Sequence, residues 1–213
     1  MTSSAPDTPR PLVIEAGRTD LLYWHDLWRY RELFFILAWR DVAVRYKQTV
    51  IGVAWAFVRP FMTMVVFTVV FGKIAKLPTE GAAPYAVMVF AGLLPWTLFA
   101  SILTDASTSI VGSFSLISKV YFPRLVIPLA NALTNLTDFG IAAVLLIPLM
   151  AWYRVMPTST FLFLPLVVVL AVAFSLGVAL WIAALNVEYR DVRVVIPWVL
   201  QIAMYVTPVV YPI

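Results

Sequence analysis

The side chains in this sequence that could do chemistry are few, and several lie within long apolar stretches. Asn131, Asn135 and Asp138 are spaced i, i+4 and i+7, with Thr134 beside them, so a helix would present all four on one side. Such a row needs partners, because an unsatisfied polar group costs free energy in apolar surroundings. Two interpretations stay open: hydrogen bonds to a helix of another subunit, or the lining of a hydrated path.

The common patterns of catalysis and metal binding are missing from the sequence. One histidine, His25, and no cysteine exclude an HExxH motif, a multi-histidine metal site and a cysteine nucleophile. We therefore interpret His25 as an interfacial polar residue rather than a catalytic base. No GxxxxGK[ST] loop is present, so the chain is not expected to bind ATP through a P-loop of its own. We expect neither a metal nor a cofactor in this chain.

Composition indicates the class of protein. Of the 213 residues, 62% are hydrophobic and 12% are charged, and the mean hydropathy is +0.93. A soluble domain has about a quarter of its residues charged. The apolar runs approach the roughly 20 residues that a helix needs to cross a hydrocarbon core. We predict an all-α integral membrane protein, whose net charge of +4 is spread along the chain and does not indicate nucleic acid.

An amphipathic helix and five spans are expected to position the polar residues. Residues 1–19 are polar and proline-bearing without an apolar signal segment, and they predict a mobile cytoplasmic tail. In residues 20–47, aromatic side chains recur at spacings of three, four or seven beside a basic stripe. This helix is expected in the headgroup plane rather than as an ordinary soluble helix. The transmembrane domain, residues 48–213, is expected to have spans at residues 50–72, 85–111, 126–153, 161–185 and 194–212.

The distribution of positive charge predicts the orientation of these spans. With the N-terminus in the cytoplasm, the outer segments contain only Lys73, Lys76 and Arg154. Fifteen Lys and Arg residues less these three leaves twelve on the cytoplasmic side. This asymmetry follows the positive-inside rule, which the reversed orientation would violate.

Charged and polar groups inside the spans are costly. Arg59 lies directly before Pro60, in the first span, where an Arg costs about 3 kcal/mol on insertion scales. We expect it either to extend towards the cytoplasmic headgroups or to face the bundle interior. Asp105, near the cytoplasmic end of the second span, is expected to reach the interface. Gln201 and Tyr205 form a smaller i, i+4 pair in the fifth span.

A connector and a loop carry charges on the cytoplasmic side. The connector, LISKVYFPRLVIPLA from Leu116 to Ala130, joins two apolar segments and suits either a docking role or an ordinary loop. The loop NVEYRDVR, residues 186–193, suits either a solvated, mutually paired turn or a contact with a cytosolic subunit.

Several segments, taken in order, resemble a known family. They are RDVAVRYKQTVIGVAWAFVRP (Arg40 to Pro60), AGLLPW (Ala91 to Trp96), LISKVYFPRLVIPLAN (Leu116 to Asn131), NVEYRDVR (Asn186 to Arg193) and TPVVYP (Thr207 to Pro212). The set is similar to the membrane permease of ABC exporters for polysaccharides, which serves lipid-linked O-antigen, capsule and teichoic acid export. The resemblance runs from about Leu21 to Ile213.

The resemblance implies a homodimeric pore in the bacterial cytoplasmic membrane, bound to two copies of a separate subunit that holds ATP and Mg²⁺. It implies that the amphipathic helix is an interface helix, and that the segment matching Ser113 to Arg124 is a coupling helix on the ATPase. It also implies a sixth span after the position of Ile213, so we expect these residues to represent an incomplete permease. The residues expected in coupling are Leu116, Lys119, Tyr121, Phe122, Pro123, Arg124, Arg40, Arg45, Tyr46, Lys47, Glu188, Arg190 and Asp191.

A pore for a glycan would combine aromatic rings with polar groups. From helix facing, the candidate pore-lining residues are Arg59, Trp96, Phe99, Asn131, Asn135, Asp138, Gln201 and Tyr205. Two alternative functions stay open. An ABC exporter for drugs or small lipids would share the architecture. A membrane enzyme of glycolipid synthesis would need paired acidic residues, and only Glu188 and Asp191 lie close together in one cytoplasmic loop.

Overall fold

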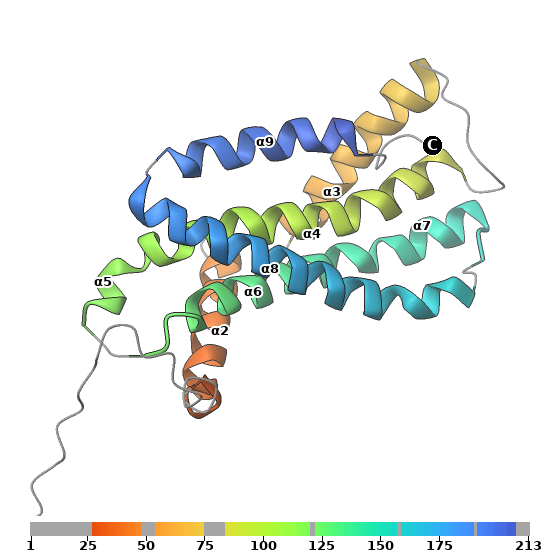
Figure 1. Cartoon of the computed structure of the whole chain (residues 1–213). Helices are drawn as coiled ribbons and strands as arrows, with labels where there is room; N and C mark the ends of the chain where they lie inside the picture. The colour runs from red at the N-terminus through yellow and green to blue at the C-terminus, as the bar shows by residue number, and fades with distance from the viewer. Residues whose placement is uncertain are drawn as a thin grey trace, which may run out of the picture.

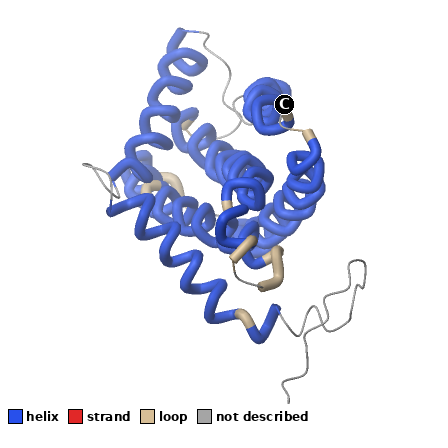
Figure 2. The backbone as a smooth tube through the Cα atoms, turned by 90° about the vertical axis from the view of Figure 1, so that its left-hand side faces the viewer, coloured by secondary structure: helices blue, strands red, loops and turns tan. Residues whose placement is uncertain are grey.

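The computed structural model describes residues 27–47, 54–74, 84–119, 122–156, 159–189 and 191–207, and every regular element in these ranges is helical (Figures 1 and 2). The expected all-α fold is confirmed. The expected N-terminal tail, His25 and the start of the amphipathic helix lie outside the described residues. The elements are α2 (Arg31–Lys47), α3 (Ala54–Phe67), the π-helical η1 (Thr68–Ile74), α4 (Tyr85–Gly112), α5 (Phe114–Ile117), α6 (Val126–Val144), α7 (Leu146–Tyr153), the 3₁₀-helical η2 (Ser159–Phe163), α8 (Leu164–Glu188) and α9 (Val192–Val206).

Four helical stretches are long and apolar enough to cross a membrane. They are Ala54–Gly72, Tyr85–Gly112, Val126–Tyr153 and Phe161–Glu188, and they match the first four expected spans. α9 has 15 residues, and the end of the fifth expected span lies outside the described residues.

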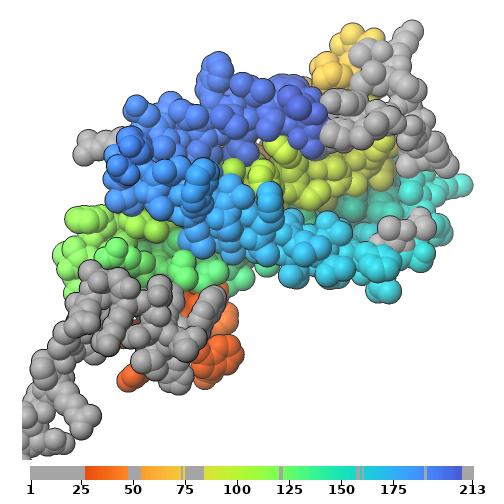
Figure 3. All heavy atoms as spheres, in the orientation of Figure 1, coloured from red at the N-terminus to blue at the C-terminus, as the bar shows by residue number. Residues whose placement is uncertain are grey.

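α4 is the central helix of the bundle. Figure 1 shows α4, α6 with α7, α8 and α9 running roughly along one direction, while α2 crosses them near one end. In the space-filling view α8 and α9 cover the near face, with part of α4 visible between them (Figure 3). Half of the apolar window of α4 is buried inside the protein, against 6% for the spans that begin at Ala54 and Phe161.

Small residues allow α8 to approach α4 closely. Ser175, Ala179 and Ala183 repeat every four residues on α8 and are fully buried. Helices in membranes associate through close packing of such small side chains, because lipid supplies no hydrophobic driving force between them. Near the end of the same face, the side-chain amide of Asn186 donates a 3.1 Å hydrogen bond to the carbonyl of Ser107 on α4.

Two local features explain where elements break or meet. The third expected span is interrupted at Leu145, so α6 ends at Val144 and α7 begins at Leu146. Pro148 accounts for this break, because its ring excludes the hydrogen bond to the carbonyl of residue 144. Near the end of η1, a Cβ atom on Gly72 would lie 3.0 Å from the ring of Tyr85, so any larger residue there would require this ring to shift.

α2 packs on the start of α6 by one face only. Leu37 and Ala38 are buried in a cluster with Phe122 and Val126. Phe35 and Trp39 of α2 are exposed, and so is Trp28 just before it. The location of this helix at the membrane interface stays a prediction. This packing brings the last turn of α2 against α4 and α6.

Candidate functional site

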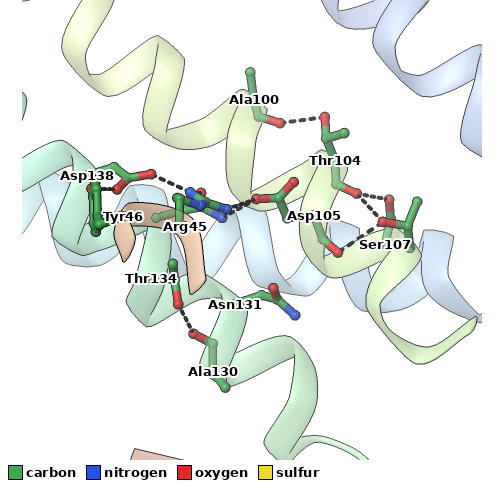
Figure 4. A network of polar contacts seen from close by, with 12 residues as sticks. Arg45, Tyr46, Ala100, Thr104, Asp105, Ser107, Ala130, Asn131, Thr134 and Asp138 are labelled. Atoms are coloured by element: carbon green, nitrogen blue, oxygen red, sulfur yellow. Dashed lines mark hydrogen bonds and ion pairs between the residues drawn. The ribbon is translucent and has the colours of Figure 1, made fainter. Parts of the chain in front are cut away.

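The last turn of α2 places Arg45 between two carboxylates of the helix bundle. Its Nη2 donates to Asp105 Oδ2 on α4 at 3.0 Å, and its Nη1 donates to Asn135 Oδ1 on α6 at 3.0 Å. Nη1 also donates to Asp138 Oδ2. Figure 4 shows the guanidinium lying between Asp138 and Asp105. The planar fork of an arginine suits this arrangement, since its donors can reach several acceptors at once.

Two further hydrogen bonds close the network. The Tyr46 hydroxyl donates to Asp138 Oδ1, and Asn135 Nδ2 donates to Asp105 Oδ2 at 3.0 Å. Side chains from α2, α4 and α6 are therefore tied together in one cluster, which we call the Arg45 cluster: Arg45, Tyr46, Asp105, Asn135 and Asp138.

The surroundings keep Arg45 charged and Tyr46 neutral. Burial disfavours the charged form of Arg45, but the charges and hydrogen bonds of Asp138 and Asp105 outweigh it and raise the pKa of Arg45 above its ordinary value. Burial, followed by the hydrogen bond to Asp138, raises the pKa of Tyr46. One cation between two carboxylates leaves the cluster with a net charge of about −1 when both are ionised.

A cavity of about 580 Å³ adjoins the Arg45 cluster. Its opposite wall is α3, which contributes Trp55, Arg59 and Thr63. The guanidinium of Arg59 lies 5.8 Å from the centroid of the Trp55 ring, a cation–π distance. Among the residues that the structure describes, no acidic side chain pairs with Arg59. Arg59 lines the cavity and is itself exposed, so extension towards the headgroups and a bundle-interior role both stay predictions.

Comparison with known proteins identifies the family. Residues 32–213 match the family model described as ABC-2 type transporter. The chain belongs to the ABC-2 type transporter family.

Three relatives of this ABC-2 transporter are named O-antigen export system permease protein RfbA. The one from Myxococcus xanthus is 30% identical over 188 residues, which is 88% of this chain and 71% of the relative. Two from Klebsiella pneumoniae are each 26% identical over 181 residues, 84% of this chain and 69% of the relative. As a member of this family, the chain is a multi-pass membrane transport protein.

Three of the predicted pore-lining residues of the ABC-2 transporter line this cavity, and they come from two helices: Arg59, Asn135 and Asp138. The predicted polar row on α6 is divided, because the Asn131 amide donates to the carbonyl of Ile127 in its own helix at 3.2 Å. The buried Thr134 hydroxyl likewise donates to the carbonyl of Ala130. Asn135 and Asp138 are the members of the row with partners on other helices of this chain, α2 and α4.

The other predicted pore residues lie elsewhere. Trp96 and Phe99 are ring neighbours with centroids 5.8 Å apart, and Phe99 stacks with Phe174 of α8 at 6.1 Å. These rings pack between helices and do not line the cavity. Gln201 and Tyr205 are exposed on α9.

The predicted coupling residues of the connector divide into exposed and buried sets. Lys119 and Arg124 are exposed and Leu116 is partly exposed, whereas Phe122 and Pro123 are buried. Tyr121 lies outside the described residues. An exposed aromatic residue, Phe114, lies just before the connector, at the start of α5.

The remaining coupling candidates also differ in direction. Arg45 and Tyr46 point into the bundle, whereas Arg40 forms an exposed 2.8 Å pair with the adjacent Asp41. Lys47 is exposed. At the turn between α8 and α9, Glu188 and Asp191 are exposed and form no ion pair among the described residues, and Arg190 lies outside them.

The sequence analysis missed Asp105 as a member of the cluster. It was expected to reach the interface, yet it binds both Arg45 and Asn135. A usable signal was present: Ser101, Asp105 and Thr108 are spaced i, i+4 and i+7, a polar row on α4 like the one on α6. Two polar rows on different spans indicate that the two helices face each other or a common partner.

Proposed function

We propose that this chain is the permease subunit of an ATP-driven exporter that moves lipid-linked polysaccharide from the cytoplasm across the bacterial cytoplasmic membrane. The observation that carries this proposal is the similarity to three proteins named O-antigen export permeases, over 84% to 88% of this chain. Membership of a family of transporters supports it, as does the ordered set of segments from Arg40 to Pro212.

The exporter would be a homodimer of this chain with two copies of a cytoplasmic ATP-binding subunit, which supplies ATP and Mg²⁺. The N-terminus would lie in the cytoplasm, as the distribution of positive charge requires. Two surfaces at one end of the bundle suit the ATP-binding subunit. α5 and the turn between α8 and α9 lie at the same end (Figure 1), and there Phe114, Lys119 and Glu188 are exposed.

A chain of packed contacts leads from this end into the bundle. Phe122, within the connector, packs with Leu37 of α2 and Val126 of α6. The far end of α2 holds Asp105 and Asp138 through Arg45. A displacement of the connector would thus reach both α4 and α6 through side chains that are already in contact.

The function is tested by depleting the protein in its native cell and locating the lipid-linked polysaccharide. Accumulation on the cytoplasmic face with synthesis intact is expected. An unchanged amount of surface glycan would contradict the proposal and favour an exporter of drugs or small lipids. Loss of the polymer itself would contradict it in favour of an enzyme of glycolipid synthesis.

A further inference from the structure

The cavity beside the Arg45 cluster has hydrogen-bonding capacity that the protein does not use. The Oδ2 atom of Asp105 accepts hydrogen bonds from Arg45 and Asn135, but its Oδ1 atom accepts none from a described residue. The hydroxyl of Ser101, one turn before it on α4, has no hydrogen bond in the same described region. Across the cavity, the guanidinium of Arg59 contacts the Trp55 ring and no acceptor among these residues.

We propose that this cavity is a binding site for a short stretch of uncharged carbohydrate chain, held between Trp55 and Arg59 of α3 and Ser101 and Asp105 of α4. The proposal rests on the proposed export function and names the residues that meet the glycan. Sugar hydroxyls both donate and accept hydrogen bonds. They match a wall that offers a carboxylate oxygen as acceptor, a guanidinium as donor and a hydroxyl as either.

The aromatic group adds the second requirement of a sugar site. A pyranose ring has apolar C–H faces, and the ring of an amphipathic Trp provides a flat apolar surface beside polar groups. Trp55 is 41% exposed and lines the cavity, so its ring is accessible. Of the three rings singled out for glycan stacking from the sequence, Trp96 and Phe99 do not line this cavity, and neither does Tyr205.

Charge favours an uncharged ligand over a phosphate. Phosphate oxygens only accept hydrogen bonds, so they would be repelled by the free oxygen of Asp105. The two carboxylates Asp105 and Asp138 balance the charges of Arg45 and Arg59, so the cavity wall has no net positive charge to attract an anion. The volume of about 580 Å³ falls in the range of about 300–1,000 Å³ that is usual for ligand sites.

The test uses the full chain purified in detergent micelles. The probe is the native cell's own surface polysaccharide, released from lipid by mild acid and fractionated to short oligosaccharides. Saturable binding to the unmodified protein is expected by saturation-transfer NMR and thermophoresis. Arg59→Gln and Trp55→Leu should each weaken binding by about tenfold, the equivalent of about 1.4 kcal/mol. Ser101→Ala should weaken it by a smaller factor.

The matched control is Trp198→Leu, which removes an exposed Trp of α9 that does not line the cavity. It should bind like the unmodified protein, and thermal unfolding should show that all variants are folded. Lack of saturable binding, equal loss in the control, or displacement of the oligosaccharide by millimolar inorganic phosphate would each overturn the proposal. If depletion causes the glycan to accumulate on the cytoplasmic face but the purified chain binds no oligosaccharide, the export function is supported and the proposed binding site in the cavity is rejected. If depletion leaves surface glycan unchanged, export fails whatever the binding result.

Discussion

The two arginines beside the cavity differ in how far the protein satisfies them. Arg45 reaches three side chains from two helices. Arg59, on α3, has a tryptophan ring as its neighbour and no ion pair within the described residues. On the Arg45 side of the cavity, hydrogen bonds within the protein link the side chains to one another. On the α3 side, the guanidinium of Arg59 faces the cavity. The contrast separates a group that holds helices in place from one that is available to a ligand, although both residues are cations next to apolar spans.

The same contrast recurs between the connector and the start of α5. Phe122 is 5% exposed and packs between α2 and α6, whereas Phe114, eight residues earlier, is 71% exposed. Both are aromatic residues of the segment that joins α4 to α6. Only the exposed ring can contact a separate subunit directly.

The largest expected effect on stability comes from removing the buried ring of Phe122. Phe122→Ala should destabilise the fold by about 3 kcal/mol, because it removes a buried aromatic side chain from the contact between α2 and α6. Phe114→Ala should leave stability unchanged but lower export per ATP hydrolysed. Thermal unfolding of the two variants, followed by reconstituted transport, tests both. A stable Phe122→Ala protein with impaired transport would mean that Phe122 is itself the contact with the ATP-binding subunit.

Removal of Arg45 should have the next largest effect. Arg45→Ala leaves Asp105 and Asp138 without their cation and should cost about 2 kcal/mol, less than for a fully buried pair since the side chains are 30% to 37% exposed. Arg40→Ala is the control on the same helix. Its pair with Asp41 is exposed, so less than about 0.5 kcal/mol is expected. Equal unfolding free energies for the two variants would contradict the distinction.

A smaller effect is expected at the contact between α8 and α4. Asn186→Ala removes the buried hydrogen bond to the carbonyl of Ser107 and should cost about 1 kcal/mol, the usual scale of such bonds between membrane helices. The unfolding free energy of the variant is measured in mixed micelles that contain an increasing fraction of a denaturing detergent. A change that exceeds that of Arg45→Ala would place the main polar link of the bundle on α8 instead of α2.

The smallest effect on folding is expected at the second arginine. Arg59→Gln should change the unfolding free energy by less than about 0.5 kcal/mol, because no ion pair with a described residue is lost and a cation is removed from a membrane span. The same thermal assay measures it beside Arg45→Ala. A destabilisation as large as that of Arg45→Ala would show that Arg59 is structural, and would remove the contrast between the two walls.

Much of the architecture follows from the sequence because lipid imposes a simple condition on each span. Apolar length alone located the four long helical stretches, and the break at Leu145 follows from Pro148. Burial could not be predicted in the same way. The spans of α3 and α4 are both apolar, yet only α4 is central, since lipid and protein interior are equally suitable surroundings for apolar side chains.

The polar site was predictable in part for a related reason. The row Asn135 and Asp138 was recognised by its spacing, but its partner Arg45 is 90 residues away and was interpreted as a cytoplasmic contact. A periodic pattern describes the face of one helix and does not say which helix will lie against it. The orientation of the last turn of α2 depends on the packing of Leu37 and Ala38, which the pattern does not determine.

The order of the elements in the Arg45 cluster bears on how the protein enters the membrane during synthesis. This chain inserts two carboxylates within its apolar spans: Asp138 lies near the centre of one, where a carboxylate costs about 3 kcal/mol, and Asp105 lies nearer the end of another. Their common cation lies in α2, which precedes both helices in the chain. Because synthesis proceeds from the N-terminus, Arg45 has already left the ribosome when each carboxylate reaches the translocon. The counter-ion is thus made before the charges that need it.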